Sequence, residues 1–276
     1  MPEVISSKKK ANNNPPKKEW TILGIHEKIR GSLFRIIVAL VVFSTIAFIA
    51  KDIVFNSILL APSKVDFITY KVLCRIGESI GQSELCMTNL NLSIVNLNLS
   101  GQFMKHFWVS IYVGMVLVFP LILIEIWRIA KPFVNAKFRK NLYRAIPICS
   151  LLFFIGILFS YFIIVPITIH FLATYSISSV IVNTITLDSY LGSVITLTLA
   201  VGLVFEMPVL LYNISKFGLI SKEFLKKQRK YAVVILLIVA AFITPGSDLF
   251  SLALVSAPLL ALYEVSIFVI PKRIAE

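Results

Sequence analysis

Long apolar runs separated by short polar segments make up most of this chain. A run of about 18 or more apolar residues is long enough to cross the hydrocarbon core of a bilayer as a helix. Four runs reach that length, and a further apolar block is divided by the polar segment 244–248. The pattern therefore predicts six membrane helices, at about 33–50, 104–129, 146–172, 190–214, 231–244 and 249–270.

Composition agrees with this class of protein. The 276 residues are 58% hydrophobic and 15% charged, with a mean hydropathy of +0.88, which is too apolar for a soluble domain. We therefore expect an all-α, polytopic integral membrane protein with one helical domain over residues 21–271 and an outside loop at about 51–103. Residues 1–20 form a polar, basic tail that cannot bury a core, and residues 272–276 form a short C-terminus.

The distribution of the 27 basic residues predicts the orientation of the helices. Eight of them lie at or before Arg35, six follow the second predicted helix and six follow the fourth, whereas the loop from Phe171 to Asp188 has none. Cytoplasmic loops of membrane proteins are enriched in Lys and Arg. Both termini are therefore expected in the cytoplasm. Because topology and contact with the lipid bilayer explain the net charge of +13, we do not expect a nucleic-acid partner.

Cysteines and histidines give no sign of a metal site, a cofactor or catalysis. Cys74 and Cys86 lie in the outside loop, where an oxidising exterior allows them to form a disulfide. Cys149 lies in an apolar run and is interpreted as a packing residue. No histidine follows the cysteines at the spacing of a metal site, and no nucleophile, base and orienting group occur together.

Three carboxylates lie within or at the margins of the predicted helices: Glu125, Glu206 and Glu264. A charged group at the centre of a membrane helix costs about 2.5 to 3.5 kcal/mol on insertion scales, so each must be neutral, paired or facing a polar cavity. Pro208, two residues after Glu206, has no backbone N–H to donate and therefore predicts a kink there. Glu206 and Glu264 can relay protons or ions, pair with another subunit, or act as hydrogen-bonded structural groups. Glu125, beside Trp127, also fits a simple interface residue.

Several short motifs, in one order along the chain, resemble the TatC family, the receptor subunit of the twin-arginine translocase. They are Ala61-Pro62, Gln102-Phe103, Glu125-Ile126-Trp127 with Pro132, Ser189-Tyr190, Phe205-Glu206-Met207-Pro208-Val209, Thr244-Pro245 with Asp248, and Tyr263-Glu264. The likeness covers about residues 25–270, which makes it more specific than any one motif.

The resemblance implies a cup-shaped bundle of six helices in the bacterial inner membrane. It also implies binding of twin-arginine signal peptides of folded cargo, recruitment of single-span TatA- and TatB-type partners, and homo-oligomers within the complex. By position, Arg30 matches the family's arginine at the first helix, Glu206 its intramembrane glutamate, and Asp248 the aspartate of the last outside turn. Pro62 and Asp248 are thus expected on the periplasmic side.

The chain departs from the family at the positions used for signal recognition. Lys28 stands where the family has a glutamate, and Ile129 and Phe138 stand where it has an aromatic residue and a second glutamate. Arginine binds carboxylates through paired, charge-assisted hydrogen bonds. Either Glu27, Glu125 or backbone carbonyls take that role here, or the chain comes from a lineage with few or unusual substrates or weakened recognition. The expected residues for signal binding are Glu27, Arg30, Glu125, Ile129 and Phe138, and those for partner contact are Glu206, Pro208 and Glu264.

Two other functions remain open from the sequence. Glu206, Pro208 and Glu264 can form the ion site of a proton- or ion-coupled carrier, although the chain shows no inverted repeat. A membrane assembly subunit that does not recognise signals would have the same fold.

Overall fold

The computed structural model describes residues 22–81, 93–132, 134, 136–178, 183–244 and 248–271, and most of these residues are helical. The long helices and their continuations are α1 (Ile22–Ile49), α3 (Gly101–Ala130), α4 (Ala136–Phe159), the π-helix η4 (Ser160–Ile164), α5 (Val165–Thr174), α6 (Leu187–Val204), α7 (Met207–Lys216), α9 (Arg229–Ile243) and α10 (Leu249–Val269). The shorter elements are the π-helix η1 (Ile53–Leu59), the 3-10 helix η2 (Ala61–Ser63), α2 (Ile68–Ile80), β1 (Ile94–Val95), β2 (Ile185–Thr186) and α8 (Lys222–Lys227).

Five helical stretches among the described residues are long and apolar enough to cross a membrane. They are His26–Ile49, Gly101–Ala130, Leu142–Thr174, Leu187–Lys216 and Leu249–Val269. The remaining long helix, α9, has 15 residues and so rises about 22 Å, less than the hydrocarbon thickness of about 30 Å. Exposed apolar side chains such as Leu33, Phe34 and Val41 fit a lipid environment for α1.

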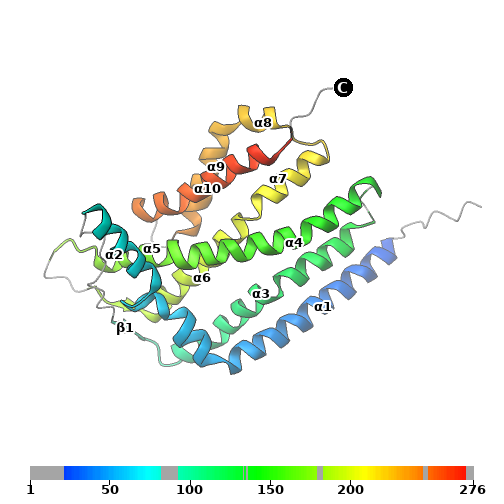
Figure 1. The fold of residues 1–276 in the computed structure, drawn as a ribbon. Helices are drawn as coiled ribbons and strands as arrows, with labels where there is room; N and C mark the ends of the chain where they lie inside the picture. Colours follow the sequence, from blue (N-terminus) through cyan, green and yellow to red (C-terminus); the bar gives the residue numbers. More distant parts are fainter. Residues whose placement is uncertain are drawn as a thin grey trace, which may run out of the picture.

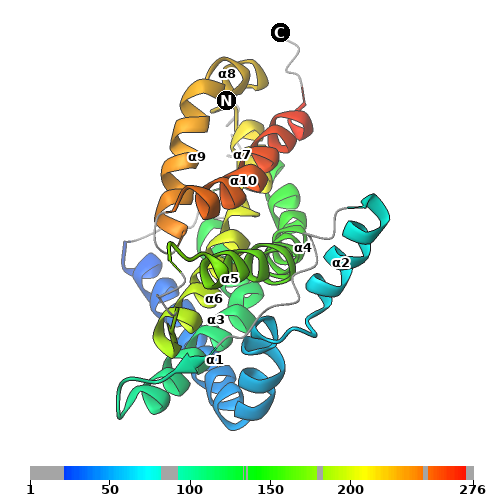
Figure 2. The same cartoon turned by 90° about the vertical axis from the view of Figure 1, so that its left-hand side faces the viewer.

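The long helices are arranged around α6. α1 packs along α3, α3 also contacts α4, and α4 crosses α6. In both views α8, α9 and α10 lie on the opposite side of the molecule from α1 (Figures 1 and 2). Leu191, Val194, Leu197 and Val201 of α6 are at most 1% exposed, which places α6 at the centre of the core.

Tyrosine hydroxyls attach the segment after α1 to the long helices. At the end of the π-helix η1, backbone carbonyl groups lack helical donors, and side chains must satisfy them. The Tyr161 hydroxyl donates to Ile58 O at 2.7 Å, and the Tyr190 hydroxyl donates to Leu59 O at 2.9 Å. The chain between α1 and α3 is therefore fixed to α6 and η4 at this end of the molecule.

A two-residue parallel pairing connects the two loops at the same end. Ile94 of β1 pairs with Ile185 of β2, and Val95 pairs with Thr186. Thr186 then caps α6 by accepting a hydrogen bond from Ser189 N at 3.2 Å. This pairing joins the start of α6 to the chain that leads into α3.

Candidate functional site: carboxylates of the membrane helices

Glu206 lies at a break between α6 and α7. Pro208 is at the start of α7 and has no N–H to donate to the carbonyl of Val204, where α6 ends. The two residues between the helices, Phe205 and Glu206, form a turn within an otherwise apolar stretch. The kink that Pro208 predicts is therefore present as an interruption of the helix.

One oxygen of the Glu206 carboxyl group has no hydrogen-bond partner. Its Oε1 atom is fully buried, and no donor among the described residues reaches it. Cys149 of α4 interacts with the same carboxyl group. A buried acceptor without a donor is unfavourable, so the carboxyl group would gain free energy from a donor that reached it.

Two glycines hold the break close to α4. A Cβ atom on Gly156 would lie 2.9 Å from Gly202 Cα and 2.7 Å from Phe205 Cγ, so only a residue without a side chain fits the crossing of α4 and α6. Gly202 is buried. This crossing sets the position of Phe205 and hence of Glu206.

Glu125 is fully paired within the chain. Its side chain is 3% exposed and accepts from Arg35 Nε at 2.9 Å, Arg35 Nη2 at 2.7 Å and Arg128 Nη1 at 2.6 Å. Arg35 Nη2 also donates to Ser32 Oγ at 3.1 Å. The paired hydrogen bonds from Arg35 join α1 to α3 and neutralise the buried charge.

The other residues expected to bind a signal lie near the start of α1, the end of α3 and the start of α4. Glu27 and Arg30 are exposed on the first turns of α1, and Ile129 is half-buried on the last turn of α3. Phe138 lies in α4, but its side chain is outside the described part of the structure. Glu27 is thus the exposed carboxylate of this set.

Glu264 is not joined to Glu206. It accepts a hydrogen bond from Arg229 Nη2 at 2.7 Å, which links α10 to α9, and both side chains are about half exposed. Within the described residues no direct interaction connects the two glutamates.

The residues expected on the periplasmic side have structural contacts. Pro62 is buried, and its carbonyl accepts from the Tyr70 hydroxyl at 2.9 Å. Burial raises the pKa of Tyr70, so this phenol stays protonated and continues to donate. Asp248 caps α10 by accepting from Ser251 N at 2.7 Å.

The expected disulfide pairs Cys74 of α2 with Cys86. Cys74 is disulfide-bonded in the structure, but Cys86 lies outside the described residues, so the identity of its partner stays a prediction. Among the described residues, no three His, Cys, Asp or Glu side chains converge where they could hold a metal ion.

The sequence reasoning missed Arg35 as the partner of Glu125. The two residues are 90 positions apart, so no local pattern connects them. A signal was present nonetheless, because Arg35 stands between Phe34 and Ile36 in an apolar stretch, where a cation requires a partner.

Comparisons with known proteins agree with this arrangement. The family model described as Sec-independent protein translocase protein (TatC) matches residues 25–258. The chain is 38% identical over 245 residues to Sec-independent protein translocase protein TatC of Blattabacterium sp. subsp. Periplaneta americana, covering 88% of this chain and 92% of that relative. It is 36% identical over 178 residues to TatCy of Bacillus subtilis, covering 64% and 70%.

Solved structures are similar as well. A crystal structure of the twin-arginine translocase receptor TatC in DDM has a TM-score of 0.69 and 30% sequence identity, covering 88% of this chain and 98% of that one. A second crystal structure of this receptor has a TM-score of 0.65 and 28% identity, with 88% and 96% covered.

Proposed function

Because this chain belongs to the TatC family and is thus a multi-pass membrane subunit of the Tat protein translocase, we propose that it is the receptor of that system. In this role it binds twin-arginine signal peptides of folded proteins and recruits single-span TatA- and TatB-type partners. The observation that carries the proposal is the buried, partnerless Oε1 atom of Glu206 at a break in a membrane helix. Its mechanism is binding and assembly, without bond chemistry.

The same proposal includes the arrangement in the membrane. Six spans form a cup in the bacterial inner membrane, both termini are cytoplasmic, and several copies assemble in the complex. The short α9 is the sixth span, and the basic segments before α1, after α3 and after α7 face the cytoplasm. Local thinning of the bilayer accommodates α9.

Signal recognition begins at the carboxylate of Glu27. Glu27 is exposed on α1 and takes part in no ion pair within the described residues. Both oxygens of Glu125 already accept hydrogen bonds, so an arginine of the signal reaches Glu125 only by displacing Arg35 or Arg128. Arg30, Ile129 and Phe138 border the signal at the adjoining helix ends.

Photocrosslinking tests this step. Probes at Arg30, Ile129 and Phe138 are exposed in membranes to a twin-arginine peptide and to the twin-lysine peptide of the same sequence. We expect crosslinks that depend on arginine, and we expect Glu27→Gln to weaken them about tenfold, since a hydrogen bond to a charged group contributes about 1.5 to 3 kcal/mol. Glu223→Gln, which removes an exposed acid from α8, is the matched control and should have no effect.

Partner recruitment depends on Glu206. A polar contact between membrane helices contributes about 0.6 to 2 kcal/mol, so losing it should lower partner retention by about threefold or more. We expect Glu206→Leu to reduce the amount of TatA- or TatB-type protein that copurifies. The melting temperature of the isolated variant should not fall, because the change removes an unsatisfied buried oxygen. Unchanged copurification with a lower melting temperature would assign Glu206 a structural role only.

The two alternatives predict different outcomes. In an ion-coupled carrier Glu206 and Glu264 would share a site, but Glu264 is paired with Arg229 and half exposed. Substrate flux in liposomes that contain this chain alone would favour the carrier. Equal crosslinking of both peptides with partner recruitment retained would favour an assembly subunit.

A further inference from the structure

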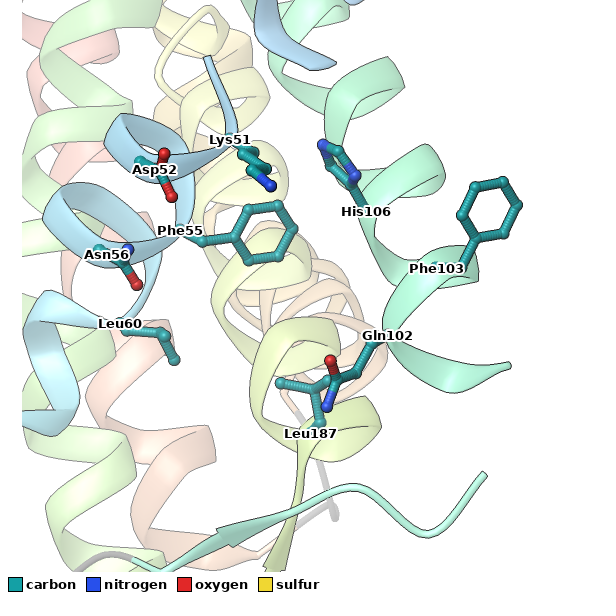
Figure 3. Close-up of a pocket in the computed structure, with 9 residues that line it drawn as sticks. All are labelled: Lys51, Asp52, Phe55, Asn56, Leu60, Gln102, Phe103, His106 and Leu187. Carbon is teal, nitrogen blue, oxygen red and sulfur yellow. The ribbon is translucent and has the colours of Figure 1, made fainter. Parts of the chain in front are cut away.

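A pocket lined by both polar and apolar side chains, here called the polar pocket for its charged groups, opens where α1 continues into η1, opposite the start of α3 (Figure 3). Its volume is about 490 Å³. Lys51, Asp52 and Asn56 line the wall formed by the end of α1 and η1, whereas Gln102 and His106 line the wall formed by α3 (Figure 3). The pocket therefore brings a cation, an anion, two amides and an imidazole together.

The two charged groups of the pocket are not used within the described structure. Lys51 and Asp52 are exposed and form no ion pair with another described residue. The Asp52 carboxylate also accepts no capping hydrogen bond from the backbone of η1, although it stands at the N-cap position. Other oppositely charged residues at this end form ion pairs with each other: Lys105 with Asp188 at 2.7 Å, and Lys71 with Asp66 at 3.2 Å. The pocket thus presents one free positive and one free negative group.

His106 forms the boundary between this pocket and an apolar groove. Its ring stacks on Phe48 with centroids 3.9 Å apart, and its Nε2 atom lies 3.0 Å from Phe48 O. A carbonyl oxygen only accepts, so Nε2 carries the proton of this hydrogen bond. Phe48 in turn lines a groove of about 440 Å³ between α1 and α3, together with Val41, Thr45, Phe107 and Ile111.

The polar pocket and the apolar groove lie at different depths along the same two helices. The apolar spans end at Ile49 on α1 and begin at Gly101 on α3, directly beside Lys51 and Gln102. Gln102 and His106 of the pocket lie near the start of the α3 span, whereas the groove extends further into both spans, to Leu40 on α1 and Ile111 on α3. The pocket is therefore at the level of lipid headgroups, and the groove is at the level of acyl chains.

We propose that the pocket and the groove together bind one ethanolamine phospholipid. The lipid phosphate contacts the Lys51 ammonium, the lipid ammonium donates to the Asp52 carboxylate, and an acyl chain lies in the groove beside Phe48 and Thr45. Charge and hydrogen-bond complementarity together select this lipid class. A choline headgroup has no N–H to donate to Asp52, and an anionic glycerol headgroup has no cation for it. This site shares no residue with the proposed signal and partner contacts.

Native mass spectrometry of the full chain in detergent tests the proposal. Ethanolamine, choline and glycerol phospholipids with identical acyl chains are compared at equal concentration. We expect one ethanolamine lipid to be retained above the other two, and Lys51→Gln and Asp52→Asn each to lower its retention about fivefold. The matched control, Lys71→Gln with Asp66→Asn, removes one positive and one negative charge that form an ion pair elsewhere, and this variant should retain the lipid.

A photoreactive probe at Thr45 identifies the occupant of the groove. Crosslinking to ethanolamine lipid in membranes would support the proposal, and thermal melting confirms that each variant is folded. Equal retention of the three lipids would overturn it, as would pocket variants that match the control. Crosslinks from Thr45 to protein and not to lipid would show that a partner helix occupies the groove, which also contradicts the proposal.

Discussion

Glu125 and Glu206 are both carboxylates in apolar stretches, yet their hydrogen bonding differs. Glu125 accepts three hydrogen bonds from two arginines, whereas Glu206 keeps a buried oxygen that no donor among the described residues reaches. The hydrogen bonds of Glu125 are thus satisfied within the chain, whereas one oxygen of Glu206 still lacks a described donor. At the scale of residues, Glu125 therefore stabilises the contact of α1 with α3, and Glu206 is the group that we propose for contact with another helix.

Removing the charge of Glu125 should destabilise the protein. Glu125→Gln keeps the shape of the side chain but weakens the paired hydrogen bonds from Arg35, and we expect a loss of about 1 to 3 kcal/mol. Thermal melting in detergent measures the effect. Glu264→Gln is the control, because its pair with Arg229 is half exposed and should contribute at most about 1 kcal/mol. Equal losses in the two variants would contradict this assignment.

Residue types in the sequence indicate which groups need partners, but they do not identify those partners. Glu206 and Pro208, separated by one residue, predict a polar break from the local sequence alone. Arg35 in an apolar run is likewise a cation that needs a partner, and that partner, Glu125, is identified only when α1 and α3 pack together.

At the scale of elements, the break between α6 and α7 depends on packing as well as on proline. Pro120, Pro147 and Pro258 lie inside helices that continue through them, while the helix at Pro208 is interrupted. The difference at Pro208 is that the turn before it lies against Gly156 of α4. A proline therefore allows a helix to break but does not require it. At Pro208 the break occurs where α4 packs closely against α6.

Substitutions of two glycines should separate packing from helix propensity. In Gly156→Ala the new methyl group meets Phe205 and the backbone of Gly202, so we expect a loss of about 1 to 3 kcal/mol and weaker partner recruitment through Glu206. In Gly192→Ala no atom lies within 4 Å, and the gain in helix propensity should raise stability by about 0.5 to 1 kcal/mol. Melting temperatures of the two variants measure the contrast. Stabilisation of Gly156→Ala would show that the crossing is loosely packed.

At the scale of the whole molecule, the number of spans decides on which side of the membrane the C-terminus lies. Five helical stretches meet the length of a span, and α9 with 15 residues is the sixth that we propose. If α9 crosses, its two ends face opposite compartments. If it does not, α8 and the start of α10 face the same side.

Cysteine labelling tests this arrangement. In a variant without the native cysteines, Lys227→Cys at the end of α8 and Leu249→Cys at the start of α10 are exposed to a membrane-impermeant thiol reagent in sealed vesicles of known orientation. We expect Lys227→Cys to react only from the cytoplasmic face and Leu249→Cys only from the other face. Reaction of both from one face would rule out the sixth span.

The linear order of residues determined the class of the protein and the location of its apolar helices. It also determined the position of the polar break at Glu206 and Pro208, because run length, residue type and a missing N–H are local properties. Tertiary structure alone decided that Arg35 pairs with Glu125, that Gly156 meets Gly202, and that the polar pocket adjoins the groove at Phe48. Each of these joins segments far apart along the chain, and such contacts depend on how whole helices pack against each other.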